Sequence, residues 1–222
     1  MPVFNGTLHE IDKNETKRYA GLRRGGEFPD ALVEDACSAV LAIAEPRGIY
    51  RQYPYDPVAH RLLCTPPFLI EGKQVQKHLG QSEQAVVMAV TAGSAVEAEI
   101  DRMFAEKNYT QGLLMDAAAT TAAEMIADQL NRYIDGLAAK NGYMTTWRYS
   151  PGYGDWPLLQ QPEMVRAVHA GDIGISVTTG CMLLPRKSVT AIIGLRRAEG
   201  KDCSLQGCAV CSMRDSCASR KE

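Results

Sequence analysis

Residues 148 to 157 read Arg-Tyr-Ser-Pro-Gly-Tyr-Gly-Asp-Trp-Pro, and no other stretch of the chain is as distinctive. Pro151 lacks a backbone N–H and biases Ser150 away from helical angles. The two glycines can adopt positive φ, so the backbone can close tightly around a small ligand. The guanidinium of Arg148, at the mouth of such a turn, suits a carboxylate or a phosphate. The stretch therefore predicts a binding loop rather than a regular helix or strand.

Apolar residues at helical spacing predict four helices around this loop. The predicted helices cover residues 30 to 44, the residues that follow Gly93 as far as Phe104, residues 113 to 139, and Met164 to Ala170. The longest of them has an apolar face and a polar face. The polar face carries Thr121, Glu124, Asp128 and Asn131.

Short β-rich runs predict strands at Ala85 to Val90, Ile173 to Thr178 and Ser188 to Arg196. We expect the last two to form an antiparallel pair. Residues 47 to 70 are rich in proline and tyrosine, which predicts irregular structure with one short strand. Helices and strands do not alternate regularly along the chain, so the predicted fold class is α+β rather than a doubly wound sheet.

Composition limits the size and the partners of the protein. With 222 residues, 45% of them hydrophobic, the chain can form one substantial core, and we expect one domain over residues 1–200 followed by a cysteine-rich tail over 201–222. The net charge of -2 gives no electrostatic case for nucleic acid or an anionic membrane as a partner, because both normally require a basic surface. The N-terminus lacks the pattern of a signal peptide, and no apolar run approaches the roughly 18 residues of a membrane span. The sequence therefore predicts a cytoplasmic protein.

The tail contains Cys203, Cys208, Cys211 and Cys217, a spacing that predicts a thiolate metal site. Zinc is often bound by two Cys-x2-Cys pairs, whereas only one such pair is present here. A [4Fe-4S] cluster accommodates the unequal outer spacing and is favoured over zinc, with a tail that binds no metal as a third alternative. The other cysteines are expected to be small buried hydrophobes: Cys37, Cys64 and Cys181.

The motif Arg148-x-x-Pro151-Gly152-Tyr153, followed by a Trp-Pro turn, resembles the S-adenosylmethionine site of the activation (reactivation) domain of cobalamin-dependent methionine synthase. The resemblance extends over about residues 15 to 197. It implies a single α+β domain with a mainly antiparallel twisted sheet flanked by helices. Further matching segments are Arg18-Tyr19-x-Gly21, Thr91-Ala92-Gly93, Ala122-Ala123-Glu124 and Met182-Leu-Leu-Pro185-Arg-Lys-Ser188-Val189.

The resemblance also implies roles for residues of the loop. Arg148 would meet the carboxylate of the methionine moiety, for which a planar guanidinium is well suited. Tyr153 would cover the ligand or stack near its sulfonium, although its ring could equally anchor the loop on the core. Glu124 would face the ligand's ammonium group, unless it belongs to a solvated helix face. The backbone groups of three loop residues would complete the site: Ser150, Pro151 and Gly152.

The function that the resemblance implies is support of a corrinoid methyltransferase. The chain would present the methyl group of S-adenosylmethionine to cob(II)alamin on a separate protein, methionine synthase or a relative, while flavodoxin or ferredoxin supplies one electron. No side chain need act as an acid, base or nucleophile, so whether the protein counts as an enzyme is left open. The chain has four histidines: His9, His60, His78 and His169. None of them stands in the Asp-x-His-x-x-Gly pattern of corrinoid-carrying domains. Cobalamin is therefore expected to be bound by the partner protein.

Two other classes of protein are compatible with parts of the sequence. An independent methyltransferase would usually contain Gly-x-Gly-x-x-Gly on a Rossmann sheet, and the chain has no such motif. An iron–sulfur or zinc protein with a redox or scaffold role would account for the tail. That second alternative leaves the arginine loop unexplained.

Overall fold

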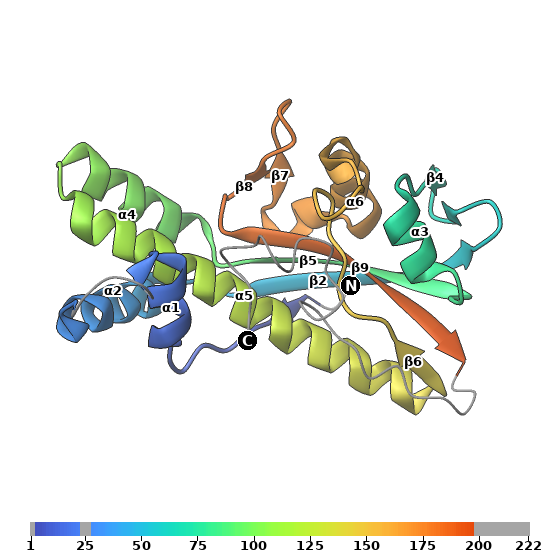
Figure 1. Cartoon of the computed structure of the whole chain (residues 1–222), viewed down its shortest axis with the longest axis horizontal. Helices are drawn as coiled ribbons and strands as arrows, with labels where there is room; N and C mark the ends of the chain where they lie inside the picture. Colours follow the sequence, from blue (N-terminus) through green and yellow to red (C-terminus); the bar gives the residue numbers. More distant parts are fainter. Residues whose placement is uncertain (1–2, 23–27, 198–222) are drawn as a thin grey trace.

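The computed structural model describes residues 3–22 and 28–197, so the cysteine tail lies outside the described residues. The fold is α+β, as predicted. A seven-stranded sheet in the order β4-β3-β2-β5-β9-β6, with β1 beside β2, carries helices on both faces (Figure 1). Every strand pair in the described residues is antiparallel.

The strands of the sheet are β1 (Phe4–Asn5), β2 (Arg47–Asp56), β3 (Arg61–Leu62), β4 (Phe68–Leu69), β5 (Gln84–Thr91), β6 (Tyr143–Thr145) and β9 (Ser188–Arg197), and a separate hairpin consists of β7 (Ser176–Val177) and β8 (Leu183–Leu184). The α-helices are α1 (Lys13–Tyr19), α2 (Asp30–Ile43), α3 (Lys73–Leu79), α4 (Ser94–Ala105), α5 (Tyr109–Lys140) and α6 (Gln161–Val168). Short 3₁₀ turns occur at Leu158–Gln160 and Ala170–Ile173.

The prediction of irregular structure over residues 47 to 70 is wrong for its first half. β2 is a ten-residue strand that pairs with β5 from Arg47↔Thr91 to Pro54↔Gln84. Pro54 is compatible with this strand because N–H groups alternate in direction, and the next N–H, that of Tyr55, donates to Glu83 on the β5 side. The tyrosines and isoleucine of the segment favour extended structure, and their pairing with β5 outweighs the proline signal.

The expected pairing of residues 173–178 with 188–196 is also wrong. β7 pairs with β8, while β9 lies in the main sheet between β5 and β6. The first residue of the predicted strand, Ile173, instead ends the 3₁₀ turn Ala170–Ile173. β9 has buried side chains on both faces, so it is stabilised most as a central strand.

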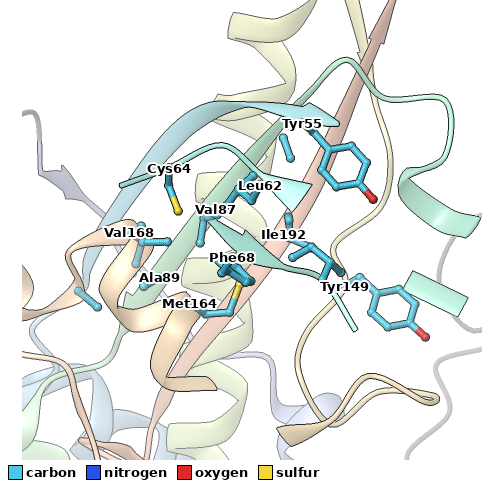
Figure 2. Close-up of a cluster of buried hydrophobic side chains, with 14 of the residues drawn as sticks. Tyr55, Leu62, Cys64, Phe68, Val87, Ala89, Tyr149, Met164, Val168 and Ile192 are labelled. Carbon is cyan, nitrogen blue, oxygen red and sulfur yellow. The ribbon is translucent and has the colours of Figure 1, made fainter. Parts of the chain in front are cut away.

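Alternate residues of the central strands form two separate cores on the two faces of the sheet. On one face, side chains such as Met88 and Ile193 pack against Ile126 and Leu130 of α5. On the other face, α3, α6 and the β3–β4 segment cover a second cluster, which Figure 2 shows around Val87 and Ile192. The two faces therefore receive different layers of helices.

The 32 residues of α5 extend about 48 Å at 1.5 Å per residue. The helix is longer than the predicted 113–139 and runs beyond the sheet, where α1, α2 and α4 pack against its N-terminal half (Figure 1). A third, helix-only core forms there around Val33, Val96 and Leu114. Within the described residues, no helix combines the length and apolar character needed to cross a bilayer.

Candidate functional site

Residues 148–157 form the loop that their sequence predicts. Two turns close it: the N–H of Tyr153 donates to the carbonyl of Ser150 at 3.1 Å, and the N–H of Trp156 donates to that of Tyr153 at 3.0 Å. Gly152 and Gly154 have φ values of 92° and 54°, in the left-handed region that glycine tolerates best. The glycines are thus required by the backbone of this loop.

The second half of the loop is anchored to the protein at two points. The carboxylate of Asp155 accepts hydrogen bonds from the N–H groups of Lys73 and Gln74 at 2.8 and 3.0 Å, which caps the first turn of α3. Trp156 is buried at 1% exposure, and its indole N–H donates to the side chain of Gln160. These anchors hold the loop in place while Gly152, Tyr153 and Gly154 remain exposed.

Arg148 lies between the end of β6 and α5. Its neighbour Tyr149 is bridged to Ile192 and buried on the α3–α6 face of the sheet, and Arg148 reaches the helix on the other face. Its Nη1 is 2.8 Å from a carboxylate oxygen of Asp128, and its Nη2 is 3.2 Å from one of Glu124. The Arg148 side chain is only 19% exposed, so both ion pairs are partly shielded from water.

Glu124 and Arg148, both proposed from the sequence, are therefore in direct contact. Asp128 was assigned only to a polar helix face, and its contact with Arg148 was missed. The sequence does contain a signal for this contact, namely the spacing of four residues between Glu124 and Asp128. Residues i and i+4 share one face of a helix, so a cation that reaches one of them can reach the other.

This group of one guanidinium and two carboxylates is suited to a zwitterion. A guanidinium has five N–H donors, of which the two ion pairs occupy only some, and it can bind a carboxylate through two parallel hydrogen bonds. The two carboxylates offer acceptors for an ammonium group. An α-amino acid moiety carries both of these charges on adjacent groups.

The remaining predicted residues lie in the loop with different exposures. Tyr153 is 55% exposed, and its ring lies edge-on to Tyr149 with 6.3 Å between the centroids. Ser150 donates its hydroxyl to the carbonyl of Thr190 at 2.7 Å, so its side chain bonds β9. Pro151 is buried and Gly152 is exposed. The exposed ring of Tyr153 is thus available to a ligand, whereas Ser150 and Pro151 support the backbone.

An aromatic cluster lies behind the loop. The His78 ring is 4.4 Å from that of Trp147 and 5.4 Å from that of Tyr149, measured between centroids. A ring nitrogen of His78 is 2.8 Å from the carbonyl oxygen of Trp147. Burial lowers the pKa of His78, with this hydrogen bond acting in the opposite direction. The carbonyl of Trp147, the residue before Arg148, is therefore fixed by a contact with a half-buried histidine.

Helix α1 adds a residue to the surroundings of Glu124. Burial, and next the negative charge of Glu124, raise the pKa of Tyr19. The guanidinium of Arg18 lies 4.0 Å from the centre of the Tyr19 ring. Tertiary structure thus brings Tyr19, from the matching segment Arg18-Tyr19-x-Gly21, close to Glu124, although no ligand role for Tyr19 was expected.

The cysteines divide into two groups. Cys37, Cys64 and Cys181 are free and buried, as expected for small hydrophobes, and burial raises the pKa of the Cys37 thiol. Within residues 3–22 and 28–197 no cluster of three or more His, Cys, Asp or Glu side chains could hold a metal ion. The proposed ligands of the tail lie outside the described residues: Cys203, Cys208, Cys211 and Cys217.

Comparison with known proteins supports the fold through structure rather than sequence. No protein-family model and no curated protein sequence matches the chain. Among solved structures, the MetH reactivation domain bound to AdoHcy matches with a TM-score of 0.61 and 16% sequence identity, over 91% of this chain and 81% of that one. The chain therefore has the fold of the MetH reactivation domain, as its resemblance in sequence implied.

Proposed function

We propose that this protein binds S-adenosylmethionine and presents its methyl group for the reductive methylation of cob(II)alamin on a separate corrinoid methyltransferase, with methionine synthase as the first candidate. The observation that supports it best is the contact of Arg148 with Glu124 and Asp128 beside an anchored loop, in a fold shared with a protein crystallised with AdoHcy. AdoHcy is S-adenosylmethionine without the transferred methyl group.

In this proposal the protein contributes position and charge. Arg148 binds the ligand's carboxylate, the α5 carboxylates bind its ammonium group, and Tyr153 covers the sulfonium side. Cob(II)alamin gains one electron from flavodoxin or ferredoxin, and the resulting cobalt electron pair attacks the methyl carbon. The carbon–sulfur bond breaks with its electron pair on sulfur, which leaves AdoHcy. None of these steps requires an acid, a base or a nucleophile from this chain.

The decisive experiment follows the cobalt spectrum. A cob(II)alamin-loaded corrinoid protein and a one-electron donor are mixed with S-adenosylmethionine, with and without this protein. We expect methylcobalamin to form at a rate that depends on this protein and on S-adenosylmethionine. Equal rates in both mixtures would contradict the proposal, and transfer to another acceptor would favour an independent methyltransferase.

The cysteine tail supports a second proposal, that it holds a [4Fe-4S] cluster, or zinc, through Cys203, Cys208, Cys211 and Cys217. A cluster could relay the electron, whereas zinc would only stabilise the tail. Metal and sulfide analysis of anaerobically purified protein separates iron–sulfur, zinc and no metal. An unchanged methylation rate after Cys208→Ser and Cys211→Ser would refute the relay. Metal binding without any binding of S-adenosylmethionine would favour the redox or scaffold alternative.

A further inference from the structure

Four polar side chains form a row along one face of α5, at intervals of four residues. The row is about 18 Å long, at 1.5 Å per residue over its twelve-residue span. Its C-terminal half contacts Arg148, as described above, and its N-terminal half contacts a different cation, Lys187. The members of the row are Asp116, Thr120, Glu124 and Asp128.

Lys187 directly precedes β9 and is fixed against α5. Its ammonium group is 2.8 Å from a carboxylate oxygen of Asp116 and 2.9 Å from the hydroxyl of Thr120. The Lys187 side chain is 13% exposed, whereas that of Asp116 is 43% exposed. A carboxylate has acceptor sites for about four hydrogen bonds. Asp116 is therefore oriented by Lys187 and still has oxygen lone pairs that face solvent.

The strand edge between the two cations is not covered by another strand of the described residues. β6 pairs with β9 only at Leu195 to Arg197, and Tyr149 forms a single bridge at Ile192. From Ser188 to Ala191, β9 pairs with β5 on its other side only. At Thr190 the hydroxyl of Ser150 donates to the strand carbonyl at 2.7 Å, so the loop bonds this edge at that position through a side chain. An elongated ligand can lie along the polar row beside this edge.

Asp116 lies eight residues before Glu124 on the same face of α5, or about 12 Å along the helix axis. S-adenosylmethionine is elongated, with the amino acid at one end and the nucleoside at the other. If the amino acid occupies Arg148 and Glu124, the nucleoside end can extend toward Asp116. A carboxylate is a common partner of ribose hydroxyls, because it can accept a hydrogen bond from them.

We infer that Asp116 binds the ribose hydroxyls of the ligand, with Lys187 as the positioning residue that orients the carboxylate. This inference rests on the proposed binding of S-adenosylmethionine. It assigns the two ends of the α5 row to the two ends of one ligand: Arg148, Glu124 and Asp128 to the amino acid, and Asp116 with Lys187 to the nucleoside.

Calorimetry with two ligands tests the assignment. S-adenosylmethionine has both ends, whereas 5′-methylthioadenosine has the nucleoside without the amino acid. We expect Asp116→Asn to weaken binding of both ligands about tenfold. Arg148→Ala should weaken only S-adenosylmethionine. Asp101→Asn is the matched control, because Asp101 is also an exposed carboxylate paired with a cation, Arg186, outside the row.

A second experiment changes the ligand instead of the protein, so its result does not depend on whether a variant folds. The 2′-deoxy and 3′-deoxy forms of 5′-methylthioadenosine are titrated into the unaltered protein, and at least one should bind about tenfold more weakly than the parent. Equal binding of the parent to the unaltered protein and to folded Asp116→Asn would overturn the inference, while S-adenosylmethionine binding would stand. If the unaltered protein binds neither ligand, the proposed function itself fails.

Discussion

Arg148 concentrates the proposed recognition in one side chain. Its guanidinium is oriented by two carboxylates from a single helix face, so it is already in position before any ligand arrives. A preorganised cation loses less conformational entropy on binding than a flexible one. Tertiary packing therefore fixes the orientation of the Arg148 guanidinium and of its N–H donors.

Arg148→Ala should weaken the binding of S-adenosylmethionine by about ten- to a hundredfold, because charge-assisted hydrogen bonds contribute roughly 1.5–3 kcal/mol. Isothermal titration calorimetry measures the change. Arg102→Ala is the matched control, since Arg102 also pairs with two carboxylates, Glu99 and Glu106, but on the exposed side of α4. Unchanged affinity in a folded Arg148→Ala protein would contradict the role proposed for this residue.

We expect His78 to make the stability of the protein depend on pH. Because burial lowers its pKa in the folded state, the unfolded chain binds more protons between the folded pKa and the usual value near 6.5. His78 should therefore contribute stability above about pH 6.5 and lose it as the pH falls toward the folded pKa. The unfolding free energy of His78→Gln, measured by urea titration between pH 7.5 and 5, should fall less steeply than that of the unaltered protein. Parallel pH profiles would contradict this role.

Among the elements, the loop 148–157 and helix α5 carry the site in different ways. The helix supplies side chains at fixed spacing, which sequence periodicity predicts. The loop depends on the side-chain cap from Asp155 to α3 and on the burial of Trp156, two contacts that join segments far apart in the chain. The position of the loop is thus set by contacts with other segments of the chain.

A pair of glycine variants tests how closely the loop is packed. A methyl group at Gly154 would overlap the hydroxyl of Tyr149 and the side chain of Gln74, and φ is 54° there. We expect Gly154→Ala to lower the free energy of unfolding by about 1–3 kcal/mol. Gly136→Ala, in the interior of α5 where the added carbon meets nothing within 4 Å beyond the neighbouring helix backbone, should raise it by about 0.5–1 kcal/mol. Denaturant titration distinguishes the two, and equal effects would mean that the loop relaxes freely.

At the scale of the whole molecule, two of the three cores share one long helix. α5 contributes to the sheet core through its C-terminal half and to the helix-only core through its N-terminal half. The polar row that contacts Arg148 and Lys187 spans the part of α5 where these two cores meet along the helix. The position of the site therefore depends on the correct docking of both halves of the molecule on α5.

A chain that ends at residue 200 tests the proposed division into a domain and a tail. All residues proposed to bind S-adenosylmethionine precede this point, so the shortened protein should bind it with an affinity within about twofold of the full chain, which is less than 0.5 kcal/mol. Calorimetry on both proteins makes the comparison. A loss of binding in a folded, shortened protein would show that the tail belongs to the site.

The sequence by itself determined the α+β class, the helices around residues 30–43 and 94–105, the strand at 84–91, and the loop that begins with Arg148. Those features arise from local periodicity and from the backbone limits of proline and glycine. Residues 47–56 and the partners of β9 were predicted wrongly, because strand pairing joins residues far apart in the chain. Only the tertiary structure brought Arg148, Tyr19 and Lys187 to the α5 row, since each of these contacts depends on how separate elements pack rather than on local spacing.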